Sequence, residues 1–132
     1  MKILIVDGSE SVRRRVDKVL KDINDNLQVY HAENGADAID VLEKNNGINI
    51  LFSDTDMPEM DGLTLARTMK NREDLRDVEI VFVTMECCLL MKLEAKEIGV
   101  RGWLPKPLKP NLLNNILEKI TRRLDLKSKV AA

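Results

Sequence analysis

The sequence has no long hydrophobic run and almost no net charge, and both absences narrow its class. The apolar run at residues 3–6 is only four residues long before Asp7, too short for the core of a signal peptide. No apolar stretch approaches the roughly 20 residues that a membrane span needs. We therefore expect a cytoplasmic protein without membrane insertion. The net charge of -1 gives no overall field that would draw the protein to nucleic acid, so no direct nucleic-acid partner is expected.

Cysteine and histidine are too few for a metal or redox centre. The two cysteines, Cys87 and Cys88, are neighbours, and a disulfide between adjacent residues would close a strained ring. The single histidine, His31, is expected on the surface at the end of a strand. We assign no chemistry to these three residues.

The sequence does contain enough apolar residues for one compact domain. Its 132 residues are 44% apolar, which lets a chain of this size bury roughly 65 to 70% of its unfolded surface. No repeat, low-complexity tract or linker divides it. We expect one domain over residues 1–125, a short flexible tail at 126–132, and no output domain on the chain.

Five short apolar runs rich in β-branched residues predict five strands. Several of them lack the polar alternation of a half-exposed strand, which indicates that both faces are covered, as in a parallel sheet. The runs lie at residues 3–6, 27–30, 48–52, 78–83 and 102–104.

Segments with helical spacing separate and follow these strands. Ser9 is placed to cap the first helix, Pro110 to begin the last, and Gly99 to end the fourth. A strand-helix alternation repeated five times predicts a parallel sheet with helices on both faces. The helical segments lie at residues 12–23, 35–45, 62–71, 86–98 and 112–124.

Polar side chains stand after four of the predicted strands, namely Asp7, Asp54, Thr84 and Lys106. Ligands of open parallel sheets bind outside the carboxyl ends of the strands, where the strand order reverses. With the order 2-1-3-4-5, Asp7 and Asp54 would share one crevice. Two carboxylates that share a crevice favour a hard cation such as Mg²⁺. Thr84 and Lys106 could then hold the oxygens of a phosphoryl group on Asp54.

Four motifs at these strand ends carry a family resemblance. In their order and position they resemble the response-regulator receiver domain, of the stand-alone chemotaxis-regulator kind, from residue 2 to about residue 124. The resemblance implies a flavodoxin-like, doubly wound α/β fold, with a five-stranded parallel sheet in the order 2-1-3-4-5 and five helices. The motifs are ILIVDGSESVRR (3–14), DTDMPEMDG (54–62), VFVTM (81–85) and GWLPKPL (102–108).

The resemblance also implies a role for each residue at the site. Asp54 would be the phosphoacceptor, and Asp54, Asp7 and the backbone carbonyl of Asp56 would bind Mg²⁺ or Mn²⁺. Thr84 and Lys106 would stabilise the phosphoryl oxygens. The bond between Lys106 and the following proline would be cis.

The resemblance places the output of the domain on a protein surface. Trp103 would be the aromatic switch residue, which takes up space that Thr84 vacates when it moves toward the phosphoryl group. This movement would alter the face formed by the fourth helix, fifth strand and fifth helix, where a target protein binds. The phosphoryl donor would be a sensor histidine kinase, a phosphotransfer protein or a small phosphodonor. The domain would not be an enzyme beyond catalysing its own phosphorylation and dephosphorylation.

Three positions depart from the usual receiver pattern. Gly8 replaces the second acid after the first strand, so we expect reduced affinity for Mg²⁺. Asp56 stands where a neutral residue is more usual, and its side chain would either replace the missing carboxylate or repel the phosphoryl group and shorten its lifetime. Met85 follows Thr84 where a small residue is common, which predicts slow phosphorylation or slow hydrolysis. Nearby, Asp61 is expected to cap a helix and Glu59 to face solvent.

Two other functions fit parts of the sequence. A pseudo-receiver would keep the fold as a binding module and lose the phosphoryl chemistry through Gly8. More remotely, Asp54-Thr55-Asp56 fits the DxD motif of haloacid-dehalogenase-type phosphohydrolases, with Asp54 as nucleophile and Asp56 as acid and base. That family places its DxD on the first strand, whereas here Asp7 lies upstream.

Overall fold

The five predicted strands form one parallel sheet, and the computed structural model describes residues 1–131 of the chain. The strand order is β2-β1-β3-β4-β5, as the resemblance implied. The strands are β1 (Lys2–Val6), β2 (Gln28–Ala32), β3 (Ile48–Ser53), β4 (Glu79–Thr84) and β5 (Gly102–Pro105).

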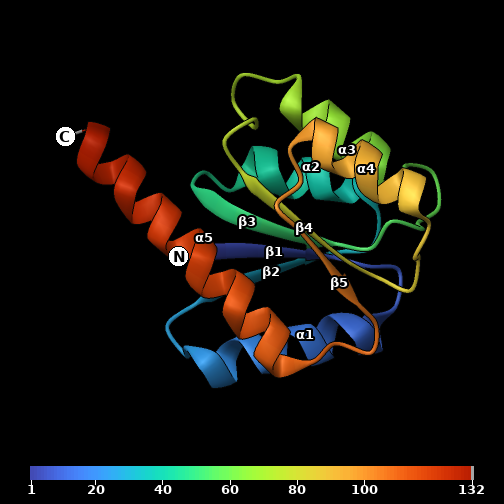
Figure 1. Cartoon of the computed structure of the whole chain (residues 1–132), viewed down its shortest axis with the longest axis horizontal. Coiled ribbons are helices and arrows are strands. Elements are labelled where there is room, and N and C mark those ends of the chain that lie inside the picture. The colour runs from blue at the N-terminus through green and yellow to red at the C-terminus, as the bar shows by residue number, and fades with distance from the viewer. Residues whose placement is uncertain (132) are drawn as a thin grey trace.

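Helices cover both faces of this sheet. Figure 1 shows α2, α3 and α4 on one face and α1 and α5 on the other. The helices are α1 (Glu10–Ile23), α2 (Gly35–Lys44), α3 (Gly62–Lys70), α4 (Leu89–Ile98) and α5 (Pro110–Ala131). None of the helices within residues 1–131 has the length and apolar character needed to cross a bilayer.

The core has two layers because successive strand residues point to opposite faces. In β1, Leu4 and Val6 pack toward α2, α3 and α4, whereas Ile3 and Ile5 pack toward α1 and α5. All four side chains are at most 2% exposed. This double burial explains why the central strands read as unbroken apolar runs.

The predicted helix caps are confirmed. The Ser9 side chain accepts a hydrogen bond from the Val12 N–H, and the Asp61 side chain accepts one from the Thr64 N–H. Gly99 ends α4 with a left-handed backbone (φ 104°), which favours glycine.

Helix α4 begins three residues later than predicted, because side chains take the backbone N–H groups of residues 86–88. The Thr84 hydroxyl accepts from the Glu86 N–H at 3.0 Å. One carboxylate oxygen of Glu86 accepts from the Cys87 and Cys88 N–H groups at 3.1 and 3.0 Å. Such local bonds compete with helix formation. Residues 86–88 therefore form a loop, and Cys88 is the N-cap of α4.

The last helix extends further than the predicted helical segment 112–124, over residues 126–131 of the expected tail. Helix α5 continues to Ala131 and projects beyond the sheet (Figure 1), while residue 132 lies outside the described residues. The apolar stripe that predicted the helix ends at residue 124, whereas Leu126 and Val130 are 63% and 87% exposed. Contacts with the core therefore do not set the end of this helix.

Candidate functional site

The carboxyl ends of the strands bring the four predicted polar residues together. Asp7 follows β1 and Asp54 follows β3, and the last residues of these strands are paired in the sheet. The Asp54 N–H donates to the Val6 carbonyl at 2.9 Å, which fixes the two acids side by side. Thr84 ends β4, and its carbonyl accepts from the Lys106 N–H at 3.0 Å.

Lys106 joins the two carboxylates. Its Nζ lies 2.7 Å from Asp7 Oδ2 and 3.0 Å from Asp54 Oδ2. The bond from Lys106 to Pro107 is cis, as the resemblance implied. Burial by itself lowers the pKa of Lys106, but the hydrogen bonds to Asp7 and Asp54 outweigh burial and raise the pKa above its usual value. The site therefore holds a permanent cation between two acids.

Backbone N–H groups bind the other oxygen of each carboxylate. Asp7 Oδ1 accepts from the Ser9 N–H at 2.8 Å. Asp54 Oδ1 accepts from the Thr55 N–H at 2.7 Å and from the Asp56 N–H at 3.4 Å. Both side chains are thereby held in one orientation.

Gly62 keeps the loop after β3 close to the helix that follows. Its N–H donates to the Thr55 carbonyl at 2.9 Å. A Cβ at residue 62 would lie 2.4 Å from the Asp54 carbonyl oxygen and 2.9 Å from the Thr55 Cα, both backbone atoms. Only glycine permits this approach, which fixes the backbone around Asp54.

Arg13 holds the backbone of Asp7 in place, and the sequence analysis did not single it out. It is 8% exposed, and its Nη1 donates to the Asp7 carbonyl at 2.6 Å. Its spacing was a usable signal, because Arg13, Val16 and Leu20 follow the i, i+3, i+7 pattern of the buried face of α1. A basic residue on such a face needs a partner, and here the partner is the backbone of Asp7.

Hydrogen bonds through Glu86 connect Thr84 at the site to Trp103, which lies beside α4. The Thr84 hydroxyl accepts from the Glu86 N–H, and the Glu86 carbonyl accepts from the Trp103 indole N–H at 2.9 Å. The indole ring packs edge-on against Phe82, with centroids 5.6 Å apart, and lies 5.8 Å from Lys92 Nζ. The polar contacts of Trp103 thus run back to Thr84.

The three departures from the receiver pattern occupy exposed positions. Gly8 and Asp56 lie at the surface beside the two acids. The Met85 side chain is 81% exposed, so its packing gives no support to the prediction of slow phosphorylation or slow hydrolysis. That prediction stays open to a rate measurement. Glu59 is also exposed, as expected, and adopts a positive φ of 67°.

The oxygen atoms at the site fit a hard divalent cation. Asp7 Oδ2 and Asp54 Oδ2 both lie within hydrogen-bond distance of Lys106 Nζ, so the two carboxylates are close enough to share a cation. Mg²⁺ typically takes one or two carboxylates and keeps several waters. Within residues 1–131, no group of three or more His, Cys, Asp or Glu side chains is arranged to hold a metal ion. The site therefore offers two adjacent carboxylates, with the Asp56 carbonyl as the third expected ligand.

Comparisons with known proteins agree with this geometry. The model of the response regulator receiver domain matches residues 3–118. A chemotaxis protein CheY homolog of Campylobacter jejuni is 34% identical over 120 residues, which are 91% of this chain and 92% of the relative. The chemotaxis protein CheY of Pseudomonas aeruginosa is 33% identical over 125 residues, which are 95% and 99% of the two chains.

Solved structures give the same result. The chemotaxis protein CheY4 of Vibrio cholerae aligns with a TM-score of 0.81 and 30% identity, covering 90% of this chain and 97% of that one. A receiver domain protein of Clostridium thermocellum, at 21% identity and a TM-score of 0.84, shows the shared fold alone.

The chain belongs to the response regulator receiver domain family. The relatives named above are chemotaxis proteins of nearly the same length, and the chain is similar to them over almost its whole length. Such receiver domains are signalling modules rather than classical enzymes. The phosphohydrolase alternative loses its basis, because Asp54-Thr55-Asp56 follows the third strand of a receiver sheet.

Proposed function

We propose that this chain accepts a phosphoryl group on Asp54 and signals through a protein-binding surface that changes when Asp54 is phosphorylated. The observation that supports this most is the Lys106 ammonium, which lies within hydrogen-bond distance of both Asp7 and Asp54. A cation in this position is already placed to bind the oxygens of an acyl phosphate.

The proposed reaction is a direct transfer. A carboxylate oxygen of Asp54 attacks the phosphorus of a phosphohistidine on a sensor histidine kinase or phosphotransfer protein, or of a small phosphodonor. The new O–P bond forms as the bond to the donor breaks, and the leaving group takes up a proton. The Lys106 ammonium would then donate a hydrogen bond to one oxygen of the transferred phosphoryl group, and the Thr84 hydroxyl would donate one to another oxygen.

The same bonds would drive the conformational change. Charge-assisted hydrogen bonds contribute about 1.5 to 3 kcal/mol each, so those from Lys106 and Thr84 would supply about 3 to 6 kcal/mol. Moving an equilibrium from 1:99 to 99:1 takes about 5.5 kcal/mol. Lys106 already bonds to Asp7 and Asp54 before phosphorylation, so only the difference between its old and new bonds counts, and the two residues would supply part of the switch.

Mg²⁺, or Mn²⁺, would be held by Asp7, Asp54 and the backbone carbonyl of Asp56. When bound, it would neutralise charge that develops on the transferred group. Asp7 is the only acid available directly after β1, because the next residue is Gly8. We therefore propose a metal-dependent reaction with weakened metal affinity.

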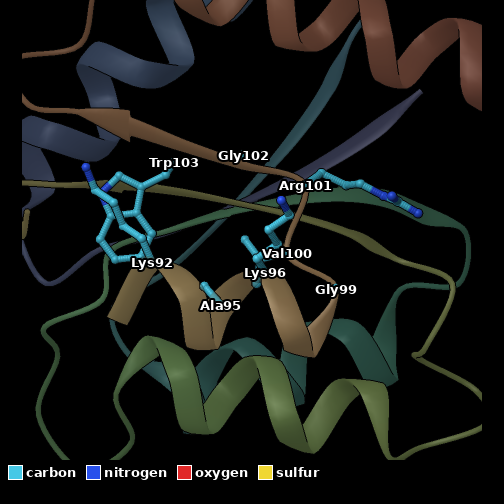
Figure 2. A pocket seen from close by; sticks show the side chains of 8 residues that line it. All are labelled: Lys92, Ala95, Lys96, Gly99, Val100, Arg101, Gly102 and Trp103. Atoms are coloured by element: carbon cyan, nitrogen blue, oxygen red, sulfur yellow. The ribbon is translucent and has the colours of Figure 1, made fainter. Parts of the chain in front are cut away.

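The target would bind the face formed by α4, β5 and α5. Figure 2 shows the groove between α4 and β5, with Trp103 at one end and Arg101 at the other. Lys92, Lys96 and Arg101 supply three cations to a space of about 460 Å³. Leu89, which is 67% exposed, adds apolar surface at the start of α4. Both features suit a protein partner.

The setting of this signalling is also part of the proposal. The names of the relatives favour a chemotaxis pathway, and a different regulatory pathway or a phosphorelay are the alternatives. We propose a cytoplasmic location, where a histidine kinase or phosphotransfer protein would meet the domain.

The emission of Trp103, the only tryptophan, tests the proposal. Adding Mg²⁺ and a small phosphodonor should change the emission of the wild type and leave that of Asp54→Asn unchanged. An unchanged wild type would favour the pseudo-receiver, for which Gly8 is the specific observation.

A further inference from the structure

Two buried threonine hydroxyls meet beside the phosphorylation site. Thr55 Oγ1 and Thr84 Oγ1 lie 2.7 Å apart, and the two residues are 3% and 2% exposed. Thr55 directly follows Asp54, and Thr84 ends β4. Their bond therefore ties the loop that carries the phosphoacceptor to the strand that carries the switch residue.

The hydroxyl of Thr84 is engaged in this bond rather than with Asp54. It contacts Thr55 and accepts from the Glu86 N–H at 3.0 Å. Among residues 1–131, no hydrogen bond joins the Thr84 side chain to Asp54 or Lys106. To bond to a phosphoryl group on Asp54, Thr84 Oγ1 would have to move, and this movement would lengthen its 2.7 Å contact with Thr55 Oγ1.

Thr55 is held in place independently of Thr84. Its N–H donates to Asp54 Oδ1 at 2.7 Å, and its carbonyl accepts from the Gly62 N–H at 2.9 Å. The backbone of Gly62 packs directly against it. The branched Cβ of threonine also restricts rotation of the side chain. The backbone of Thr55 is therefore held in place while Thr84 moves.

We propose that Thr55 is a positioning residue that holds the Thr84 hydroxyl away from Asp54 and so opposes the switch. The inference rests on the proposed function, in which Thr84 binds the phosphoryl group. When Thr84 turns toward that group, its bond to Thr55 breaks and the buried Thr55 hydroxyl loses its partner. An unpaired buried hydroxyl is unfavourable, so Thr55 stabilises the unphosphorylated conformation.

A titration with beryllium trifluoride and Mg²⁺, which together mimic a stable phosphoryl group, tests the proposal through Trp103 emission. Thr55→Val keeps the shape of the side chain and removes the hydroxyl. Because one hydrogen bond contributes modestly, the midpoint should fall by about two- to tenfold. Thr55→Ser keeps the hydroxyl and should restore the wild-type midpoint. An unchanged or raised midpoint in Thr55→Val would overturn the proposal.

A second measurement separates this inference from the proposed function. Chemical denaturation of wild type, Thr55→Val, Thr84→Val and the double variant measures the coupling of the two hydroxyls without any phosphodonor. We expect the unfolding constant of the double variant to be about two- to tenfold lower than the product of the two single effects predicts. Independent effects would contradict the bond itself. A coupled pair in a protein that ignores beryllium trifluoride would overturn the proposed function, and with it the role of Thr55 in switching.

Discussion

Gly8 leaves room for the carboxylate that most receiver domains carry at this position. A Cβ placed on Gly8 would have the Glu33 carbonyl oxygen as its nearest neighbour, at 3.9 Å, an ordinary contact. Gly8→Asp should therefore fold normally and bind Mg²⁺ roughly tenfold more tightly, because a third carboxylate joins the site. Calorimetric titration of Mg²⁺ measures this. Gly8→Asn is the matched uncharged control, and equal affinities for the two variants would show that the missing charge is unimportant.

Asp56 is the residue most able to replace that missing carboxylate. If its side chain takes part, directly or through water, Asp56→Asn should bind Mg²⁺ several-fold more weakly than the wild type. The loss of Mg²⁺ affinity should be smaller when Gly8→Asp is also present, because the aspartate introduced at residue 8 would supply the carboxylate that Asp56 replaces in the wild type. Mg²⁺ titrations of the four proteins measure both effects. Unchanged affinity in Asp56→Asn, with a longer phosphoryl lifetime, would instead identify Asp56 as a residue that repels the phosphoryl group.

Sequence reasoning located the residues at strand ends better than those in loops. Asp7, Asp54 and Lys106 follow apolar runs, and the topology of a parallel sheet brings such positions together. The contact of Thr55 with Thr84 depends on how the loop after β3 turns, and no periodicity encodes that turn. Contacts of this kind require the backbone geometry.

At the scale of an element, Glu79 at the start of β4 connects the sheet to α5. Its carboxylate is nearly buried and accepts from Arg101 at 2.9 Å and Arg123 at 3.0 Å, with Lys127 at 3.7 Å. Burial by itself raises the pKa of Glu79, but the hydrogen bonds to the two arginines outweigh it and lower the pKa below its usual value. This cluster anchors the projecting helix to the body of the domain.

Glu79→Gln should therefore lower the free energy of unfolding by about 1 to 3 kcal/mol at pH 7. Because the folded pKa is lowered, this stabilisation is complete above the ordinary pKa of a glutamate. It is lost as pH falls through the lower pKa of the folded state. Urea denaturation from pH 7 down to pH 3 should show the two proteins converging at low pH. Glu118→Gln, which removes an exposed pair with Arg122, is the control and should change little.

The N-cap residue of α3, Asp61, gives a second prediction about stability. Its side chain accepts from the Thr64 N–H at 2.8 Å, so Asp61→Ala should cost about 1 kcal/mol of stability. Asp61→Ser retains a capping oxygen and should recover most of the loss. Thermal unfolding of the three proteins provides the comparison, and equal stabilities would contradict the capping role.

Helix ends were the least predictable elements, for two different reasons. The start of α4 was placed too early because the side chains of Thr84 and Glu86 take backbone N–H groups that a helix would otherwise use. The end of α5 was placed too early because Leu126 and Val130 add no core contact, so the apolar stripe stops before the helix does. Periodicity reports burial, and neither end is set by burial.

At the scale of the whole molecule, the candidate phosphorylation site and the proposed partner-binding surface lie on different parts of the sheet. Its carboxyl edge holds the acids and Lys106, while the face of α4, β5 and α5 carries Trp103 and the groove of Figure 2. Thr84 and Glu86 join the two through consecutive hydrogen bonds. Apolar periodicity predicted the parallel sheet with helices on both faces, whereas the strand order came from the family resemblance. Five strands can be ordered in many ways that bury the same residues.

The mass of the intact protein after treatment with a small phosphodonor such as acetyl phosphate and Mg²⁺ tests the central claim most directly. We predict the addition of one phosphoryl group per chain to the wild type, located on Asp54 by peptide mapping, and no addition to Asp54→Asn. A wild type that gains no mass, or an Asp54→Asn variant that gains as much as the wild type, would contradict the account.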